Sequence, residues 1–138
     1  MQKFYFPNIS SHHFWSLNIT LVPGDRVWLI GDLWAGKTTI AQFLIHQYMN
    51  DQKISVRSPT YVYYQKYGTS LYHFDLYRAD DYTTFESIWG EEILDNPQNI
   101  CIIEWPDRIE QYWKPTKIIR IEKTDDPLLR SITLEMFP

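Results

Sequence analysis

Residues 31–38 read Gly-Asp-Leu-Trp-Ala-Gly-Lys-Thr, and this stretch decides the fold expected for the chain. It fits the pattern G-x-x-x-x-G-K-[ST], which is typical of a phosphate-binding loop, the P-loop. The glycines Gly31 and Gly36 let the backbone curl so that successive N–H groups point at a phosphate. Lys37 brings a mobile positive charge to the β- and γ-phosphates, and the Thr38 hydroxyl is a ligand for Mg²⁺. The motif therefore predicts a nucleotide site.

The residues on either side of the loop supply the context that such a site requires. Residues 26–31 are expected to form a strand, because most of them belong to a short apolar run rich in β-forming residues. The turn residues Pro23-Gly24-Asp25 mark its start. Residues 37–49 are predicted to form a helix, because they contain neither proline nor glycine and carry apolar side chains at helical spacing. Those apolar residues are Ile40, Ala41, Leu44, Ile45 and Tyr48. The order strand, loop, helix favours a nucleotide site over an ordinary glycine-containing β-to-α turn.

Length and composition restrict the class of protein. The 138 residues suffice for one domain with a real core, and a hydrophobic content of 44% argues against disorder. The net charge is −4, which argues against a broad nucleic-acid-binding surface but leaves room for a local patch or for nucleic acid held by a partner. We expect a soluble cytoplasmic protein, because we find no membrane-spanning run and no signal peptide. The single cysteine, Cys101, excludes an internal disulfide framework and is expected to be an inert buried thiol.

The aromatic content is high for a small chain. Six tryptophans and ten tyrosines exceed what a small core usually holds. We expect some of them on the surface, where aromatic side chains favour contacts with partners. The alternative is a core unusually rich in aromatic residues.

The whole chain predicts one α/β domain over residues 1–138, with a mixed sheet that is parallel around the loop and antiparallel at hairpins. One such hairpin joins 61–67 to 71–75 through the turn at 68–70. The expected strands are 2–6, 26–31, 54–56, 61–67, 71–75, 99–104, 117–122 and 131–136. The expected helices run from Ser10 or Ser11 to about Thr20, over 37–49, and over 83–94 with a break at Gly90, and a helical turn begins at Pro106.

Two carboxylates stand at the ends of apolar strands. Glu104 follows four apolar residues, and Asp75 ends a looser run of the same kind. Ligands bind outside the carboxyl ends of strands in open α/β sheets, and a P-loop needs a carboxylate for Mg²⁺ and often a second group to orient water. A single acid at a strand end is commonly only solvated, but two beside a P-loop favour catalysis by at least one. The residues themselves leave open which acid serves the metal and which the water.

Two further polar residues have two readings each. His73 shares a strand face with Asp75 and is able to support that acid or to sense phosphate. A strand histidine is more often a hydrogen-bonded structural residue, and we favour that reading. Thr60 follows a bend set by Pro59, and it is either a switch residue that reaches nucleotide or Mg²⁺, or an ordinary turn threonine.

Four motifs together resemble one family, the TsaE (YjeE) P-loop ATPase component of bacterial tRNA threonylcarbamoyladenosine biosynthesis. They occur in the family's order and rough spacing over residues 31–106, and their combination is far more specific than a P-loop alone. The motifs are Gly31-Asp32-Leu33 with Ala35-Gly36-Lys37-Thr38-Thr39, Ser58-Pro59-Thr60, Tyr72-His73-Phe74-Asp75-Leu76-Tyr77-Arg78, and Ile103-Glu104-Trp105-Pro106.

The resemblance implies a P-loop NTPase fold, binding of ATP with Mg²⁺, and hydrolysis that is weak without partners. It also implies partnership with the TsaD–TsaB heterodimer, in which TsaD transfers threonylcarbamoyl to adenosine 37 of tRNA. The ATPase cycle would support turnover of that complex, and tRNA would be contacted only through the partner.

By resemblance, the catalytic residues are Asp75, Glu104 and Lys37, and the Mg²⁺ ligands are Thr38 and Glu104. The same resemblance places Trp105 beside the site or on the partner surface and makes Thr60 part of a switch-like segment. The nucleotide-binding residues that it implies are Gly31, Asp32, Leu33, Trp34, Ala35, Gly36, Lys37, Thr38, Thr39, Thr60 and Trp105.

Trp34 departs from the family pattern, which usually has glycine at this position. If the backbone there needs positive φ, a side chain costs ~1–2 kcal/mol, and an indole is able to cover the phosphates. Other P-loops accept a side chain here when it points outward. We expect ATP or ADP to bind, because the lysine, the threonine and both acids are present. Two alternatives stay open: a small-molecule kinase, although the arginines are scattered rather than clustered as in a lid, and a non-catalytic adaptor with a P-loop altered at Trp34.

Overall fold

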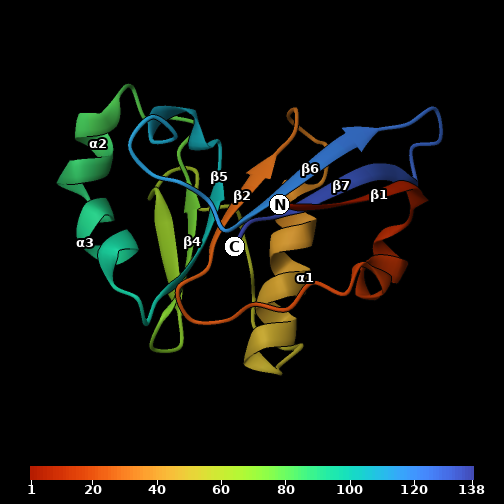
Figure 1. Cartoon of the computed structure of the whole chain (residues 1–138), viewed down its shortest axis with the longest axis horizontal. Coiled ribbons are helices and arrows are strands. Elements are labelled where there is room, and N and C mark those ends of the chain that lie inside the picture. The colour runs from red at the N-terminus through yellow and green to blue at the C-terminus, as the bar shows by residue number, and fades with distance from the viewer.

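A seven-stranded sheet organises the computed structural model, which describes residues 1–138 (Figure 1). The strand order is β1-β7-β6-β2-β5-β4-β3. The strands are β1 (Gln2–Ile9), β2 (Arg26–Ile30), β3 (Tyr64–Tyr67), β4 (Leu71–Asp75), β5 (Ile100–Glu104), β6 (Lys117–Lys123) and β7 (Arg130–Met136). The helices are α1 (Lys37–Met49), α2 (Tyr82–Ser87) and α3 (Gly90–Asp95), with 3₁₀ helices η1 (Ser11–Leu17) and η2 (Pro106–Arg108).

The centre of the sheet is parallel and its margins are antiparallel. Strands β6, β2, β5 and β4 pair in parallel, whereas β3 pairs antiparallel with β4, and β7 pairs antiparallel with β6 and β1. The mixed α/β sheet expected from the sequence is therefore confirmed, and so is the β3–β4 hairpin around residues 68–70. Because β2, β5 and β4 are parallel neighbours, their carboxyl ends lie along one edge of the sheet.

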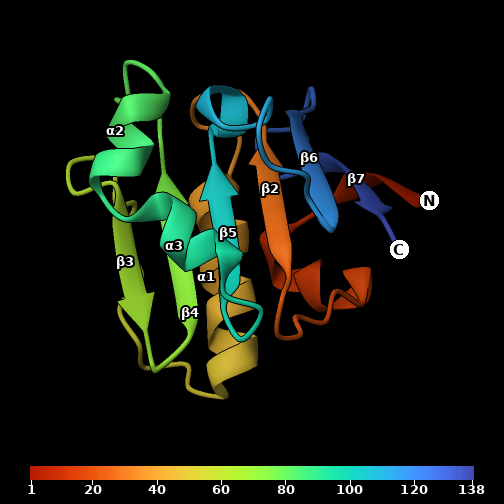
Figure 2. The same ribbon diagram turned by 60° about the vertical axis from the view of Figure 1, so that its left-hand side comes forward.

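Helices cover both faces of the sheet: α1 lies on one face, and α2 with α3 on the other (Figure 2). Successive side chains of a strand point to opposite faces. Val27 and Leu29 of β2 accordingly pack in the cluster that contains the apolar side chains of α1. Trp28 packs in the other cluster, with Phe85 of α2. The central strands are buried on both sides, which explains why β5 is apolar up to its final residue.

Helix α1 begins immediately after the loop of residues 31–36, here called the 31–36 loop. Gly36 precedes the helix with φ +109°, and Asn50 ends it in the left-handed region with φ 53°. The predicted bounds 37–49 are confirmed. The loop therefore connects the carboxyl end of a central strand to the N-terminus of a helix, as the sequence context required.

Three expected elements differ from the structure. The helix predicted to reach Thr20 is a 3₁₀ helix that ends at Leu17, because Asn18 adopts φ 53°. Residues 54–56 form no strand, and the Ile54 carbonyl is bonded instead by the His46 imidazole at 2.7 Å. The strand predicted over 61–67 begins only at Tyr64, because Tyr63 takes φ 70° and residues 60–63 form turns.

The helix predicted over 83–94 is broken, as expected, and the structure locates the break. Trp89 lies between the two segments with φ 66°, and Gly90 is the first residue of α3. A Cβ atom on Gly90 would lie 2.4 Å from Cε1 of Phe85, so only glycine allows the two short helices to pack so closely. The predicted helical turn at Pro106 is confirmed as η2.

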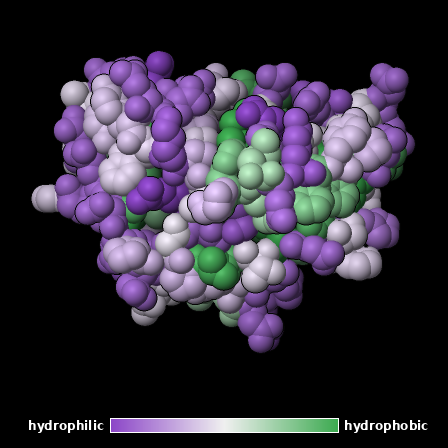
Figure 3. Space-filling view, viewed as in Figure 1, coloured by the Kyte–Doolittle hydropathy of each residue, from purple (hydrophilic) through white to green (hydrophobic).

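The surface bears out the expectation for the aromatic residues. Trp15, Trp34, Trp89 and Tyr61 are among the exposed large side chains. The face drawn in Figure 3 is largely hydrophilic, with apolar side chains gathered near its centre. No helix is long and apolar enough to cross a membrane.

Candidate functional site

The carboxyl ends of β2, β5 and β4 open onto one cavity of about 440 Å³. This volume lies in the range of small-molecule sites. The predicted site residues that line it are Asp32, Leu33, Trp34, Gly36, Lys37, Thr38, Thr39, Thr60, Asp75, Glu104 and Trp105. Gly31 and Ala35 belong to the same loop but do not line this cavity. Ser58, Tyr77 and Arg130 also line it, and the sequence reasoning did not include them.

Two residues of the 31–36 loop have positive φ, and one of them is not a glycine. Gly36 has φ +109° and Trp34 has φ 66°. Position 34 therefore does take positive φ, as considered for a position that is usually glycine. The Trp34 side chain is 86% exposed. Its indole stands at the rim of the cavity and does not fill it.

Lys37 is the buried cation of the site. Its Nζ donates to the carbonyl oxygens of Gly31 and, at 3.1 Å, Asp32, and it lies 3.9 Å from the centroid of the Trp105 ring. Burial lowers the pKa of the Lys37 ammonium, and the surrounding acids partly oppose this shift. No carboxylate pairs directly with the ammonium. A buried cation with only dipoles and an aromatic ring as partners favours an anionic ligand.

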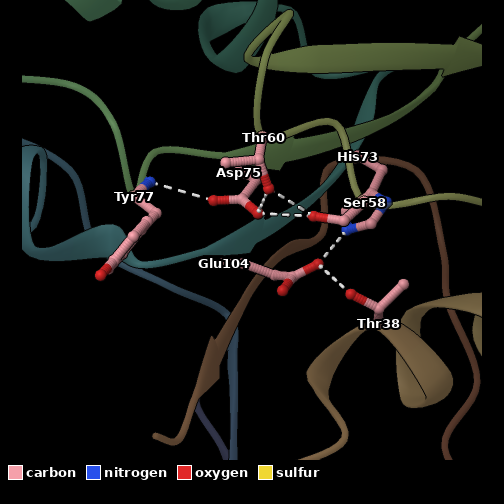
Figure 4. A network of polar contacts seen from close by, with 7 residues as sticks. All are labelled: Thr38, Ser58, Thr60, His73, Asp75, Tyr77 and Glu104. Atoms are coloured by element: carbon pink, nitrogen blue, oxygen red, sulfur yellow. Dashed lines mark hydrogen bonds and ion pairs between the residues drawn. The ribbon is translucent and has the colours of Figure 1, made fainter. Parts of the chain in front are cut away.

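Glu104 lies at the end of β5 and faces the start of α1 (Figure 4). Its Oε2 accepts a hydrogen bond from Thr38 Oγ1 at 3.4 Å and is 2.5 Å from Nε2 of His73. Glu104 and His73 are both buried. His73 is hydrogen-bonded, as favoured from the sequence, but the suggestion that it supports Asp75 is wrong. Its position two residues before Asp75 on β4 places it diagonally opposite Glu104 on the neighbouring strand.

Asp75 has a different set of partners. Its Oδ2 accepts hydrogen bonds from the hydroxyls of Ser58 and Thr60, each at 2.7 Å, and its Oδ1 accepts from the backbone N–H of Tyr77 at 3.0 Å (Figure 4). Asp75 and Glu104 are paired residues of adjacent strands. The two acids are thus neighbours, yet one is bonded to the helix that follows the loop and the other to the segment 58–60.

The protein oxygens fit Mg²⁺ bound together with phosphate. No group of three His, Cys, Asp or Glu side chains is placed to hold a metal by itself. Mg²⁺ does not require such a group, because it usually takes one or two protein oxygens and completes its octahedron with water and phosphate. Thr38 Oγ1 and Glu104 Oε2 are hard oxygen donors 3.4 Å apart. They are the two residues that the family resemblance implies as Mg²⁺ ligands.

Of the three residues that the sequence reasoning missed, two had a local signal. Ser58 belongs to the same short motif as Thr60, and Tyr77 lies two residues after Asp75. A hydroxyl two residues from a site threonine was a reasonable candidate. Arg130 had no such signal, because it lies at the start of β7, far along the chain from every predicted site residue.

The fold and the site define a class: a mixed α/β protein in which a glycine- and lysine-containing loop faces two acids at strand ends. Comparison with protein families makes this specific. The family model for "Threonylcarbamoyl adenosine biosynthesis protein TsaE" matches residues 11–132. The chain belongs to the TsaE family.

Individual relatives agree with this assignment. The chain is 41% identical over 85 residues to "tRNA threonylcarbamoyladenosine biosynthesis protein TsaE" of Haemophilus influenzae, covering 59% of this chain and 52% of that protein. The protein of the same name from Rickettsia bellii is 35% identical over 122 residues, covering 84% of this chain and 82% of that protein. Against the first relatives the match spans little more than half of their length, for example 62% of the Rickettsia conorii protein.

A solved structure shows the same fold. The crystal structure of Bacillus subtilis YdiB superposes with a TM-score of 0.72, over 99% of this chain and 87% of that chain, at 23% sequence identity. The resemblance supports the strand order and the placement of α1 described above.

Proposed function

We propose that this chain is a P-loop ATPase that binds ATP with Mg²⁺ and acts in tRNA threonylcarbamoyladenosine biosynthesis. One observation carries the proposal. Within a single cavity, the loop that carries Lys37 and Thr38 faces Glu104, which is bonded to Thr38, and Asp75, which is bonded to Thr60. A P-loop with two acids of this kind is the arrangement of nucleotide hydrolases. The proposal includes the P-loop NTPase class for the fold.

The loop and helix α1 would bind the phosphates. Backbone N–H groups of the 31–36 loop and the N-terminus of α1 attract anions, and Lys37 adds a full positive charge. When phosphate enters, the Lys37 ammonium gains a charged partner in place of the carbonyl oxygens of Gly31 and Asp32. A charge-assisted hydrogen bond of this kind is stronger than the ones it replaces.

The two acids would have separate roles because their partners differ. Thr38 and Glu104 would hold Mg²⁺, and His73 keeps the Glu104 carboxylate in place. When bound, Mg²⁺ would neutralise charge on the phosphate oxygens. Asp75 would orient the attacking water, and its hydrogen bonds to Ser58 and Thr60 connect that role to the position of the segment 58–60.

The proposed protein partner is the TsaD–TsaB heterodimer, and the ATPase cycle would support turnover of that complex. Family membership supports this part of the proposal, since the family is named for the same modification. The exposed apolar side chains Leu33 and Trp34 line the cavity and offer a surface for a protein to touch the site. The net charge of −4 agrees with contact to tRNA only through the partner.

Titration calorimetry with Mg-ATP and Mg-ADP, combined with phosphate-release assays, tests the proposal. We expect binding by the wild-type chain, slow hydrolysis alone, and faster hydrolysis with the TsaD–TsaB heterodimer. Lys37→Ala should abolish both binding and hydrolysis, whereas Lys53→Ala, at an exposed turn lysine, should leave them unchanged. Absence of binding at millimolar nucleotide would contradict the proposal.

The same assays separate the alternatives. Transfer of phosphate to an added acceptor would identify a kinase, but Arg130 is the only arginine that lines the cavity, so no arginine-rich lid covers it. Binding to the partner that ignores nucleotide, without hydrolysis, would identify an adaptor.

A further inference from the structure

Arg130 is the one cationic residue of the cavity to which the proposed chemistry assigns no role. It is the first residue of β7, and it lies 95 positions from Ala35, whose carbonyl it contacts. In the sheet, β7 and β6 lie on one side of β2, and β5 and β4 lie on the other. Arg130 therefore reaches the 31–36 loop from the flank opposite Asp75 and Glu104.

The Arg130 guanidinium is held by backbone carbonyls, and only the donors on its Nη2 are free. Its Nε donates to the Ala35 carbonyl at 2.6 Å, and its Nη1 donates to the carbonyls of Pro127 and Leu129, each at 2.9 Å. A guanidinium has five N–H donors. The two on Nη2 have no hydrogen-bond partner in the chain, and no carboxylate forms an ion pair with Arg130. The side chain thus presents a positioned charge that the protein does not neutralise.

The position of this charge selects a part of the ligand. A Cβ atom on Gly36 would lie 3.9 Å from Nε of Arg130, so the guanidinium lies against the turn that leads into α1. The γ-phosphate of a bound nucleotide belongs with Lys37, Mg²⁺ and the acids. The backbone of a P-loop cradles the remainder of the phosphate chain, and Arg130 is bonded to Ala35 of the corresponding loop here.

We infer that Arg130 contacts the diphosphate portion that ATP and ADP share, through the two free N–H groups of its Nη2. The inference rests on the proposed function of the same cavity and adds a residue and a selectivity to it. Arg130 is a ground-state binding residue for both nucleotides and does not act on the transferred γ-phosphate. A charge-assisted hydrogen bond from Nη2 to a phosphate oxygen is stronger than one between neutral groups, and a lysine ammonium lacks the planar group that the three carbonyls hold in place.

Calorimetric titration of full-length Arg130→Ala and Arg130→Lys with Mg-ADP and Mg-ATP tests this inference. In Arg130→Ala, Kd should rise about 10- to 100-fold for both nucleotides, with the ratio of the two Kd values unchanged within about 2-fold. At saturating ATP, kcat should change by less than about 2-fold. Arg130→Lys keeps the charge but loses the planar guanidinium, and it should show an intermediate loss of affinity. Arg120→Ala is the matched control, because Arg120 lies on the neighbouring strand and pairs with Glu135 outside this cavity.

A second measurement separates ligand contact from a role in holding the loop. If the charge touches phosphate, ADP affinity should fall with added salt more steeply in the wild type than in Arg130→Ala. Equal salt dependence, full affinity in Arg130→Lys, or a fall in kcat without a change in Kd would each overturn the inference. If the wild type binds neither nucleotide, the proposed function fails and the inference fails with it; if the wild type binds and Arg130→Ala binds equally well, only the inference fails.

Discussion

At the scale of single residues, Trp34 is the position at which this chain departs from the glycine expected from the family resemblance. Its backbone has φ 66°, and its side chain is 86% exposed. The left-handed conformation is unfavourable for residues with a Cβ atom, and an exposed indole gains little packing to offset that cost. The loop keeps its shape because Gly36 and the bonds of Lys37 to the loop carbonyls hold it on both sides.

The strain at Trp34 predicts an unusual order of stability among substitutions. Trp34→Gly should be more stable than Trp34→Ala by about 1 kcal/mol, which corresponds to about 3–5 °C in Tm, because only glycine relieves the positive φ. Urea unfolding of the two variants measures the difference. At the control position Trp15, which is also exposed but lies in a 3₁₀ helix, alanine should be the more stable of the two. If alanine is also the more stable of the two at position 34, the backbone there is not strained.

At the scale of elements, the site depends on the parallel pairing of β4 with β5. The pairing places Asp75 beside Glu104. It also places His73, two residues earlier on β4, on the face that α1 covers. The carboxylate at the end of β5 thus receives a buried imidazole from one neighbour and the Thr38 hydroxyl from the start of α1. Neither contact is local in the sequence.

His73→Ala should weaken the apparent Mg²⁺ affinity of ATP hydrolysis by about 10- to 100-fold, because residues that orient a metal ligand contribute at this level. The Mg²⁺ dependence of phosphate release measures the effect. His46→Ala is the control: His46 is also buried and hydrogen-bonded, but it lies near the far end of α1, about 14 Å along the helix from Lys37. A loss of the same size in both variants would point to general destabilisation.

At the scale of the whole molecule, one sheet separates two apolar clusters, and Cys101 of β5 lies in the cluster under α2 and α3. Its side chain is 1% exposed, and burial raises the pKa of the Cys101 thiol to about 12. The thiolate is the reactive form, so the folded protein protects this cysteine twice, by access and by ionisation.

Labelling of Cys101 with iodoacetamide at pH 8 should therefore proceed only through opening of the sheet. Mass spectrometry should show little modification in native buffer and rapid modification in urea. Mg-ADP at 100 times its Kd should slow the labelling about 100-fold, since a ligand that binds only the native state lowers the equilibrium constant for opening by about this factor. An exposed cysteine introduced by Gln52→Cys serves as the internal control for reagent activity. Fast labelling of Cys101 in native buffer would contradict the burial.

Much of the fold could be predicted because its signals are contiguous. The apolar run of β2, the glycines of the loop and the helical periodicity of 37–49 follow one another in the chain, and all three elements formed as expected. Two of the three predictions that failed lay where a single backbone conformation decides the outcome. Asn18 and Tyr63 adopt positive φ, and each therefore shortens the element predicted around it.

The sequence by itself determined the candidate residues that the structure brings to one cavity: Lys37 and Thr38 in the loop and the acids Asp75 and Glu104 at strand ends. These residues are recognisable because the chemistry sets their spacing from local glycines and strands. Only the tertiary structure decided that His73 bonds Glu104 and that Arg130 lines the same cavity from the opposite flank. Both facts follow from the order and register of strands in the sheet, and that order depends on long-range packing, which no local pattern in the chain encodes.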